Sequence, residues 1–138
     1  MADLTITAAN VVAGTGAIIE NGVAGATITA GQVVYLDEAS TGRYLLSDTD
    51  SATSAVRVPR GIALHAASNG QPLAICKSGL LTIGATVAAG VAYYLSGTAG
   101  GICPVADVAP GDYTSIIGMG YSVTQIKVDI QAPNVVLV

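Results

Sequence analysis

The chain has 138 residues and a mass of 13.6 kDa, which is the size of one domain. Hydrophobic residues make up 51% of it and charged residues only 10%, which argues against an intrinsically disordered chain. The net charge is -4 with five Lys and Arg residues, too few for a basic surface that binds nucleic acid. Because a monomer with so little charge dissolves poorly, we expect much of the surface to contact other protein.

The sequence predicts no membrane helix, because Gly and polar residues interrupt every apolar run before it reaches the length of a span. Residues 1–5 lack the basic residues that begin a secretory signal. We therefore expect the chain to be made in the cytoplasm and used from there, without a membrane.

The first 24 residues contain two short apolar segments, 4–7 and 17–20, on either side of Gly14-Thr15-Gly16. Their composition favours extended strands. One interpretation is an N-terminal arm, residues 1–24, that adds a strand to a neighbouring protein. The other is an edge strand of the chain's own sheet, and the sequence does not decide between them.

From residue 25 to residue 138 the pattern predicts a single all-β domain. Short runs of β-branched and aromatic residues, separated by glycine-rich turns, indicate strands at 33–36, 61–64, 72–76, 91–95, 116–119 and 125–130. Asn69-Gly70 is a strong hairpin signal. Residues 51–58 form the one plausible helix, capped by Asp50 or Ser51, although they read equally well as a loop. The apolar tail, residues 133–138, is expected to pack against the domain or a neighbouring subunit.

An internal repeat organises this domain. At an offset of 59 positions, residues 25–48 and 84–107 share nine identities, and a looser similarity extends the two copies to 25–76 and 84–130. Two copies are too few for a solenoid. We expect two related halves of one small β-barrel or sandwich, with Tyr35 in the place of Tyr94 and Leu36 in the place of Leu95.

Nucleophilic and metal-binding side chains are scarce. His65 is the only histidine, and Cys76 and Cys103 are the only cysteines. Two reduced, partly buried thiols are the favoured interpretation, with a disulfide as the alternative. A zinc site is disfavoured, because only His65 could join the two cysteines as a ligand. A nucleophile pair of His65 with Cys76 or Cys103 is the alternative to a structural or solvent-facing His65.

Other polar motifs also have structural interpretations. Asp37-Glu38 and the pair Asp48 and Asp50 lack the regular spacing of a calcium loop. Glycine-rich segments at 14–16 and 97–101 lack the lysine of a phosphate-binding loop. The sequence therefore predicts no catalytic residue, no metal site and no cofactor.

Arg57 and Arg60 either pair with carboxylates of an adjoining subunit or carry solvated loop charges. The aromatic residues are six tyrosines, for which we expect half-buried rings with hydroxyls at polar edges. A sugar-binding platform would need exposed rings instead. The tyrosines are Tyr35, Tyr44, Tyr93, Tyr94, Tyr113 and Tyr121.

The succession of turn and strand motifs resembles the small capsid decoration, or cement, proteins of tailed bacteriophages. The motifs are Gly22–Ala26, Ala30–Leu36, Gly42–Leu45, Pro59–Leu64, Asn69–Pro72 and Gly79. The resemblance implies a non-enzymatic protein that binds the major capsid protein on the outer surface of a virion and stabilises the shell. It also implies a homo-oligomer, with a trimer favoured by the three-fold positions of an icosahedral shell.

Two other classes remain open from the sequence: a receptor- or glycan-binding surface module, and an accessory β-domain of an enzyme. On the resemblance, residues 1–20 are expected to contact the capsid. Deletion of residues 2–20 is expected to leave the domain folded and the oligomer intact while abolishing capsid binding. Low charge and repeated weak contacts fit an oligomer that holds a shell by avidity.

Overall fold

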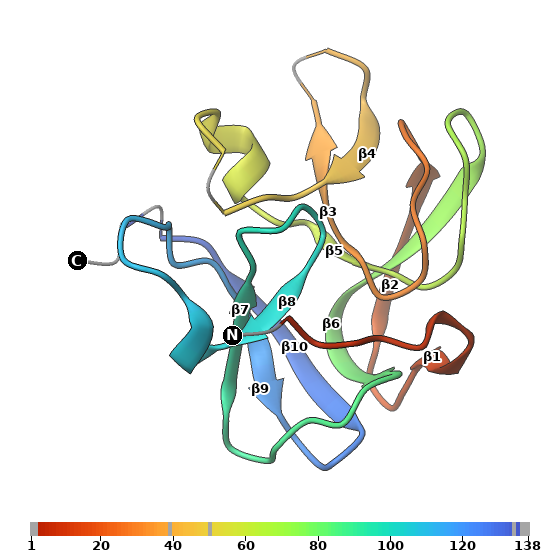
Figure 1. Ribbon diagram of the computed structural model, residues 1–138. Coiled ribbons are helices and arrows are strands. Elements are labelled where there is room, and N and C mark those ends of the chain that lie inside the picture. The colour runs from red at the N-terminus through yellow and green to blue at the C-terminus, as the bar shows by residue number, and fades with distance from the viewer. Residues whose placement is uncertain (1–2, 39, 50, 134, 136–138) are drawn as a thin grey trace.

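The computed structural model describes residues 3–38, 40–49, 51–133 and 135. These residues form an all-β protein in which one antiparallel sheet curls into a half-barrel (Figure 1), as the sequence predicts. The strands are β1 Val11–Ala13, β2 Ile18–Val23, β3 Val33–Asp37, β4 Arg43–Leu46, β5 Gly61–Ala63, β6 Pro72–Ile83, β7 Ala92–Leu95, β8 Ile102–Pro104, β9 Ile116–Gly120 and β10 Gln125–Gln131. Three 3-10 turns, η1 Ala8–Asn10, η2 Ser54–Arg57 and η3 Val105–Asp107, complete the regular structure. The helix expected at 51–58 is thus only the turn η2, and Asp50 lies outside the described residues.

The order of strands in the sheet shows two related halves. The order is β4-β3-β5-β6-β10-β9-β7-β8. Outward from the β6–β10 pair, each side therefore has one strand, β5 or β9, and then the two strands of a hairpin, β3–β4 or β7–β8. Val33 pairs with Ile62 and Val34 with Gly61 in the first half. In the second half, Ala92 pairs with Met119 and Tyr93 with Gly118, which are the same positions shifted by the offsets of the repeat.

Two glycines hold equivalent places for the same steric reason. A Cβ atom on Gly61 would lie 2.6 Å from the carbonyl oxygen of Cys76, and one on Gly118 would lie 2.2 Å from that of Lys127. In both halves the neighbouring strand approaches so closely that only glycine fits. The repeat is therefore a repeat of backbone geometry as well as of sequence.

Strand β6 belongs to both halves. Its first part pairs with β2, with Val23 opposite Pro72, and its last part pairs with β10, with Thr82 opposite Gln125. At the junction, Gly79 has φ +94° and its Cα faces the carbonyl oxygen of Gly16 so closely that a Cβ would lie at 2.4 Å. The last part of β6 is thus the counterpart of β2, and the structural repeat begins upstream of residues 25 and 84.

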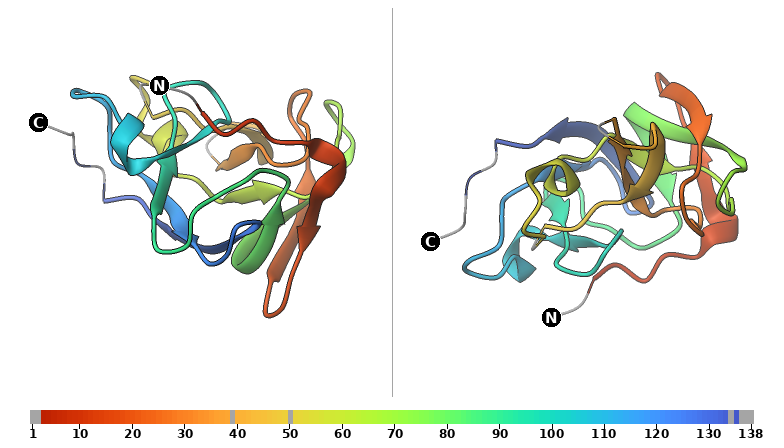
Figure 2. Two further views of the ribbon diagram at one scale, coloured as in Figure 1. Left: turned by 60° about the horizontal axis from the view of Figure 1, so that its bottom comes forward. Right: turned by 90° about the horizontal axis from the view of Figure 1, so that it is seen from above.

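The N-terminal segment forms part of the domain and is not an extended arm. Strands β1 and β2 both pair with β6, so of the two interpretations of residues 1–24 the structure shows the strand of its own sheet. Residues 4–7 form no strand but bridge the second half, because the Leu4 N–H donates to Ile102 O at 2.8 Å and the Thr7 N–H to Gly84 O at 2.8 Å. Figure 2 shows this segment (red) crossing one side of the molecule between the two halves.

Two groups of buried side chains fill the curled sheet. The main core combines both halves and includes Val33, Ile62, Leu81, Leu95 and Ile117. A second core lies inside the first half alone and includes Ile28, Val34, Leu73 and Ile75 around Tyr44. The surface area of 6460 Å² equals the roughly 6,500 Å² expected of a compact monomer of this mass.

Tyr35 and Tyr94 lie in the equivalent strands β3 and β7, as do Leu36 and Leu95, but their surroundings differ. Tyr35 is buried and Tyr94 half-buried, whereas Leu36 is half-buried and Leu95 fully buried. Tyr35 is the more buried tyrosine because both faces of β3 meet a core, while β7 faces a core on one side only. The repeat therefore preserves the strands without preserving each side-chain environment.

Candidate functional site

His65 holds a loop in place. Its Nε2 accepts a hydrogen bond from the Ala74 N–H at 3.1 Å, and its Nδ1 lies 3.0 Å from the Ala66 carbonyl oxygen. The imidazole therefore links the end of β5 to β6. This arrangement uses both ring nitrogens in the backbone of one hairpin and does not form a nucleophile pair with a cysteine.

Both cysteines are free and buried. Burial raises the pKa of the Cys76 thiol. The pKa of Cys103 is raised to about 11, first by burial and then by the negative charges of Asp3, Asp107 and Asp112. Because the thiolate is the nucleophile, these shifts make both groups unreactive at neutral pH.

The acidic pairs do not converge. Asp37 lies at the start of the β3–β4 loop, where it accepts a hydrogen bond from the Thr41 hydroxyl at 3.2 Å. Asp48 follows β4, and its counterpart Asp107 closes η3 with both carboxylate oxygens buried and without a hydrogen-bond partner in the structure. Among the described residues, no three His, Cys, Asp or Glu side chains gather so that they could hold a metal ion.

The two glycine-rich segments make backbone contacts. The Gly14 N–H donates to Leu80 O at 2.7 Å, which keeps the β1–β2 connection against β6. In the β7–β8 loop, Gly100 has φ +76° and accepts a hydrogen bond from the Val33 N–H at 3.0 Å. The glycines therefore allow close approach between strands, which accounts for their spacing without a phosphate ligand.

Arg57 is buried, with 7% of its surface exposed, so the interpretation as a solvated loop charge is wrong. Its guanidinium lies 3.6 Å from the centroid of the Tyr113 ring, and Nη1 donates to Ser51 O at 2.9 Å. A cation over a tyrosine face is stabilised by the ring quadrupole. Arg57 thus anchors the long β4–β5 connection to the second half from inside the same chain.

Arg60 pairs with Glu20 of the same chain. Its Nη2 lies 3.0 Å from Oε2 of Glu20, and Lys77 Nζ lies 3.2 Å from the same oxygen. The Tyr44 hydroxyl donates to Oε1 of Glu20. These donors, Arg60 foremost, lower the pKa of Glu20 to about 2. The carboxylate also raises the pKa of Tyr44, where burial is the larger cause.

Most of the six tyrosines are buried or half-buried and pack within the fold. Tyr44 and Tyr93 are almost completely buried, and the Tyr93 hydroxyl accepts a hydrogen bond from the Ala88 N–H at 2.9 Å. Tyr121, with 59% of its surface exposed, is the tyrosine that lies open to solvent. One exposed ring does not make the aromatic platform that sugar binding commonly uses.

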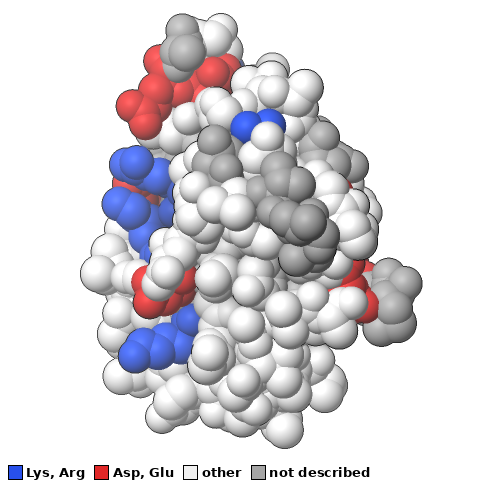
Figure 3. Space-filling view, turned by 90° about the vertical axis from the view of Figure 1, so that its left-hand side faces the viewer, with Lys and Arg blue, Asp and Glu red and all other residues white. Residues whose placement is uncertain are grey.

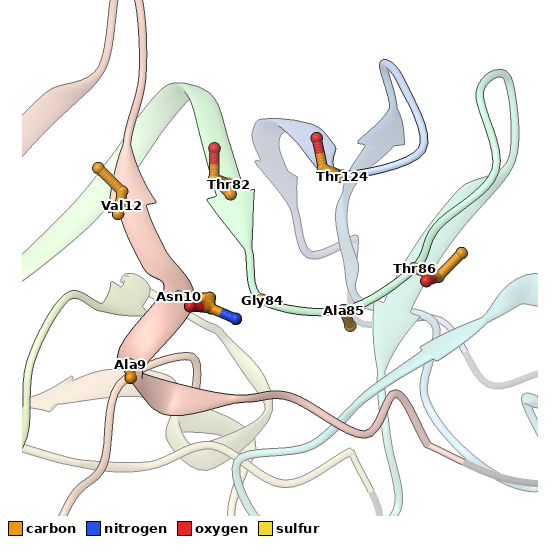
Figure 4. A pocket seen from close by; sticks show the side chains of 8 residues that line it. All are labelled: Ala9, Asn10, Val12, Thr82, Gly84, Ala85, Thr86 and Thr124. Carbon is orange, nitrogen blue, oxygen red and sulfur yellow. The ribbon is translucent and has the colours of Figure 1, made fainter.

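The distinctive feature of the surface is a hollow lined only by uncharged side chains. Residues 4–19, 78–106 and 113–126 contain no Asp, Glu, Lys, Arg or His. Eight residues from these three stretches line an open hollow of about 520 Å³ (Figure 4). It is lined by Ala9, Asn10, Val12, Thr82, Gly84, Ala85, Thr86 and Thr124. We call this hollow, together with the exposed side chains of Val12, Tyr121 and Val123, the neutral end.

The neutral end combines apolar groups with uncharged hydrogen-bonding groups. Val12 is 58% exposed and Val123 is 67% exposed, while Thr82, Thr124 and Asn10 contribute hydroxyl and amide groups to the same hollow. Figure 3 shows that wide areas of another side of the molecule also lack charged side chains. Sequence reasoning missed the neutral end, although the three charge-free stretches were visible as a signal.

Comparison with models of known protein families and with curated proteins finds no match for this chain. In the part of the chain that the structure describes, no helix is long and apolar enough to cross a membrane. The interpretation of function therefore depends on the arrangement of the chain's own residues.

Proposed function

We propose that the chain is a non-enzymatic structural protein that binds the outer surface of a phage capsid as a homo-oligomer and stabilises the shell. A virion is then its place of action, with the cytoplasm of the host as the place of assembly. The resemblance of its turn motifs to capsid decoration proteins gives the class and favours a trimer.

The observation that carries the proposal is the neutral end. Apolar side chains exposed without neighbouring charges mark surfaces that contact other protein. Such a surface is needed on a protein that binds a capsid in many copies, since several weak contacts add through avidity. Residues 3–23 belong to the folded domain and do not form a free arm. We therefore assign the capsid contact to the neutral end instead of to residues 1–20.

The test is co-sedimentation of the protein with undecorated phage shells. We expect the unchanged protein to sediment with shells, and the double variant Val12→Glu/Val123→Glu to lose at least about ten-fold in affinity, because two charges would be buried against protein. Asp112→Lys, on another part of the surface, is the control and should bind normally. Normal binding by the double variant would place the contact elsewhere, and absence of binding by all forms would refute the proposed class.

The receptor- or glycan-binding module remains the second candidate, favoured by the exposed ring of Tyr121 and by the threonine hydroxyls that line the hollow. Stoichiometric binding of a glycan to the purified protein, abolished by Tyr121→Ala, would select that function.

A further inference from the structure

The two halves of the protein differ in what covers the outer face of their sheets. In the first half, the cross-strand row Val33–Ile62–Cys76 is formed by direct pairing of β3, β5 and β6. All three side chains are completely buried in the main core. The second half has the same row, and the described residues of the chain leave it open to solvent.

The equivalent row is Ala92–Met119–Lys127, formed by the pairing of β7, β9 and β10. Met119 is 51% exposed and Lys127 is exposed. Together with Ile116, Gly118, Asp129 and Gln131, these residues line a hollow of about 330 Å³. We call this surface the open row.

Core side chains of the second half, among them Leu95 and Ile117, pack against the row of the first half. The β7–β8 loop of the second half reaches the end of the row, where Gly100 O accepts from the Val33 N–H at 3.0 Å and the Gly100 N–H donates to Ser47 O at 2.7 Å. The counterpart of this loop in the first half is the β3–β4 loop. Its described residues Glu38, Ser40, Thr41 and Gly42 are exposed, and the loop projects at the top of Figure 1, far from the start of β10 at the bottom.

We infer that the open row of one copy of this chain receives the β3–β4 loop of a second copy, in the manner in which the first half receives the β7–β8 loop. The charges match this contact, because the loop carries Asp37 and Glu38 and the row presents Lys127. Asp129 also lines the hollow and opposes the approach of the acidic loop.

The contact joins two different surfaces, so it is head-to-tail, and copies joined in this way close into a ring when the rotation between them permits. It is compatible with a trimer. The inference rests on the homo-oligomer of the proposed function and names the surfaces that form it.

The test is a charge-reversal cycle on the full chain, read by light scattering and sedimentation over a range of concentrations. Lys127→Glu and Glu38→Lys should each weaken self-association by about five-fold, as expected for a charge pair at the rim of an interface. The double variant Lys127→Glu/Glu38→Lys should recover most of the loss. Within one folded molecule, the β3–β4 loop and the start of β10 are far apart (Figure 1). Recovery of self-association in the double variant would therefore arise only from a contact between two copies.

Two further variants sharpen the result. Asp129→Asn should tighten the association, because it removes a like charge from the hollow. Asp112→Lys, which changes net charge as Glu38→Lys does, should leave the association unchanged. Circular dichroism shows whether each variant is folded.

A monomer at all concentrations, an oligomer that neither reversal weakens, or losses that add in the double variant would each overturn the inference. Shell binding by the unchanged protein is measured separately. Shell binding without the coupling between Lys127 and Glu38 would refute the open row alone, and coupling without shell binding would refute the capsid function alone.

Discussion

At the scale of single residues, charge in this protein is concentrated in a few internal contacts. Glu20 accepts from Arg60, Lys77 and Tyr44, and so ties β2 to β4, to β6 and to the residue preceding β5. Arg57 stacks on Tyr113 inside the molecule. The chain has few charged residues, and several of them are engaged in contacts within the molecule. Fewer charged side chains therefore remain on the outer surface.

Glu20 gives the protein a dependence of stability on pH. Its pKa is about 2 in the folded protein against 4.5 for an unperturbed glutamate, so the unfolded state takes up the proton first as the pH falls. The stabilisation is complete above pH 4.5 and is lost progressively toward pH 2. Since the pair is partly exposed, we expect it to be worth about 1–2 kcal/mol.

Denaturant unfolding between pH 7 and pH 2 measures this contribution. Glu20→Gln should be less stable than the unchanged protein at pH 7 and should lose less stability on acidification. Arg60→Gln in the Glu20→Gln background is the control and should add little, because the partner is already gone. Parallel stability curves for the unchanged protein and Glu20→Gln would contradict the lowered pKa.

At the scale of elements, the N-terminal segment is the main correction to the sequence-based expectation. Leu4 and Ile6 pack against the main core, and a Cβ on Gly31 would lie 2.6 Å from Ile6 Cγ2, so the segment fits closely. Its hydrogen bonds to Ile102 and Gly84 connect β8 to the end of β6. In the first half, the Ala24–Tyr44 bridge makes the corresponding connection, because it joins the end of β2 to β4.

Deletion of residues 2–8 should therefore destabilise the folded domain. Loss of the Leu4 and Ile6 contacts and of two backbone hydrogen bonds should lower the free energy of unfolding by about 3–4 kcal/mol. Thermal or urea unfolding measures the change, with the single variant Ile6→Ala expected to account for about 1–2 kcal/mol of it. A truncated protein as stable as the full chain would show instead that the segment is a dispensable arm.

At the scale of the whole molecule, the two halves cannot be separated. Strand β6 serves both, and the main core mixes Val33 and Ile62 of the first half with Leu95 and Ile102 of the second. The surface area matches that of a compact monomer.

We expect one cooperative unfolding transition, with equal calorimetric and van't Hoff enthalpies. Ile62→Ala and Ile117→Ala remove side chains that are completely buried, one in each half, and each should cost about 3 kcal/mol. Both variants should shift the same transition in scanning calorimetry. Two transitions, each sensitive to only one of the variants, would show that the halves unfold independently.

The sequence determined the elements whose signals are local. Alternation of β-branched residues with glycine-rich turns predicted β3, β7, β9 and β10, and the offset of 59 predicted that β3 and β7 are equivalent. The Asn69-Gly70 turn is confirmed, with Gly70 at φ +89° and the Gln71 N–H donating to Ser68 O at 2.9 Å. These features depend on neighbouring residues and on backbone sterics, which a sequence displays directly.

The tertiary structure decided everything that depends on which segments meet. The sequence ended a strand at Cys76, but β6 continues through Gly79 to Ile83, because strands on both sides pair with it. The burial of Arg57, the pairing of Glu20 with Arg60, and the meeting of residues 4–19, 78–106 and 113–126 at one end likewise join positions far apart in the chain. Such contacts follow from the curl and register of the whole sheet, which no local pattern encodes.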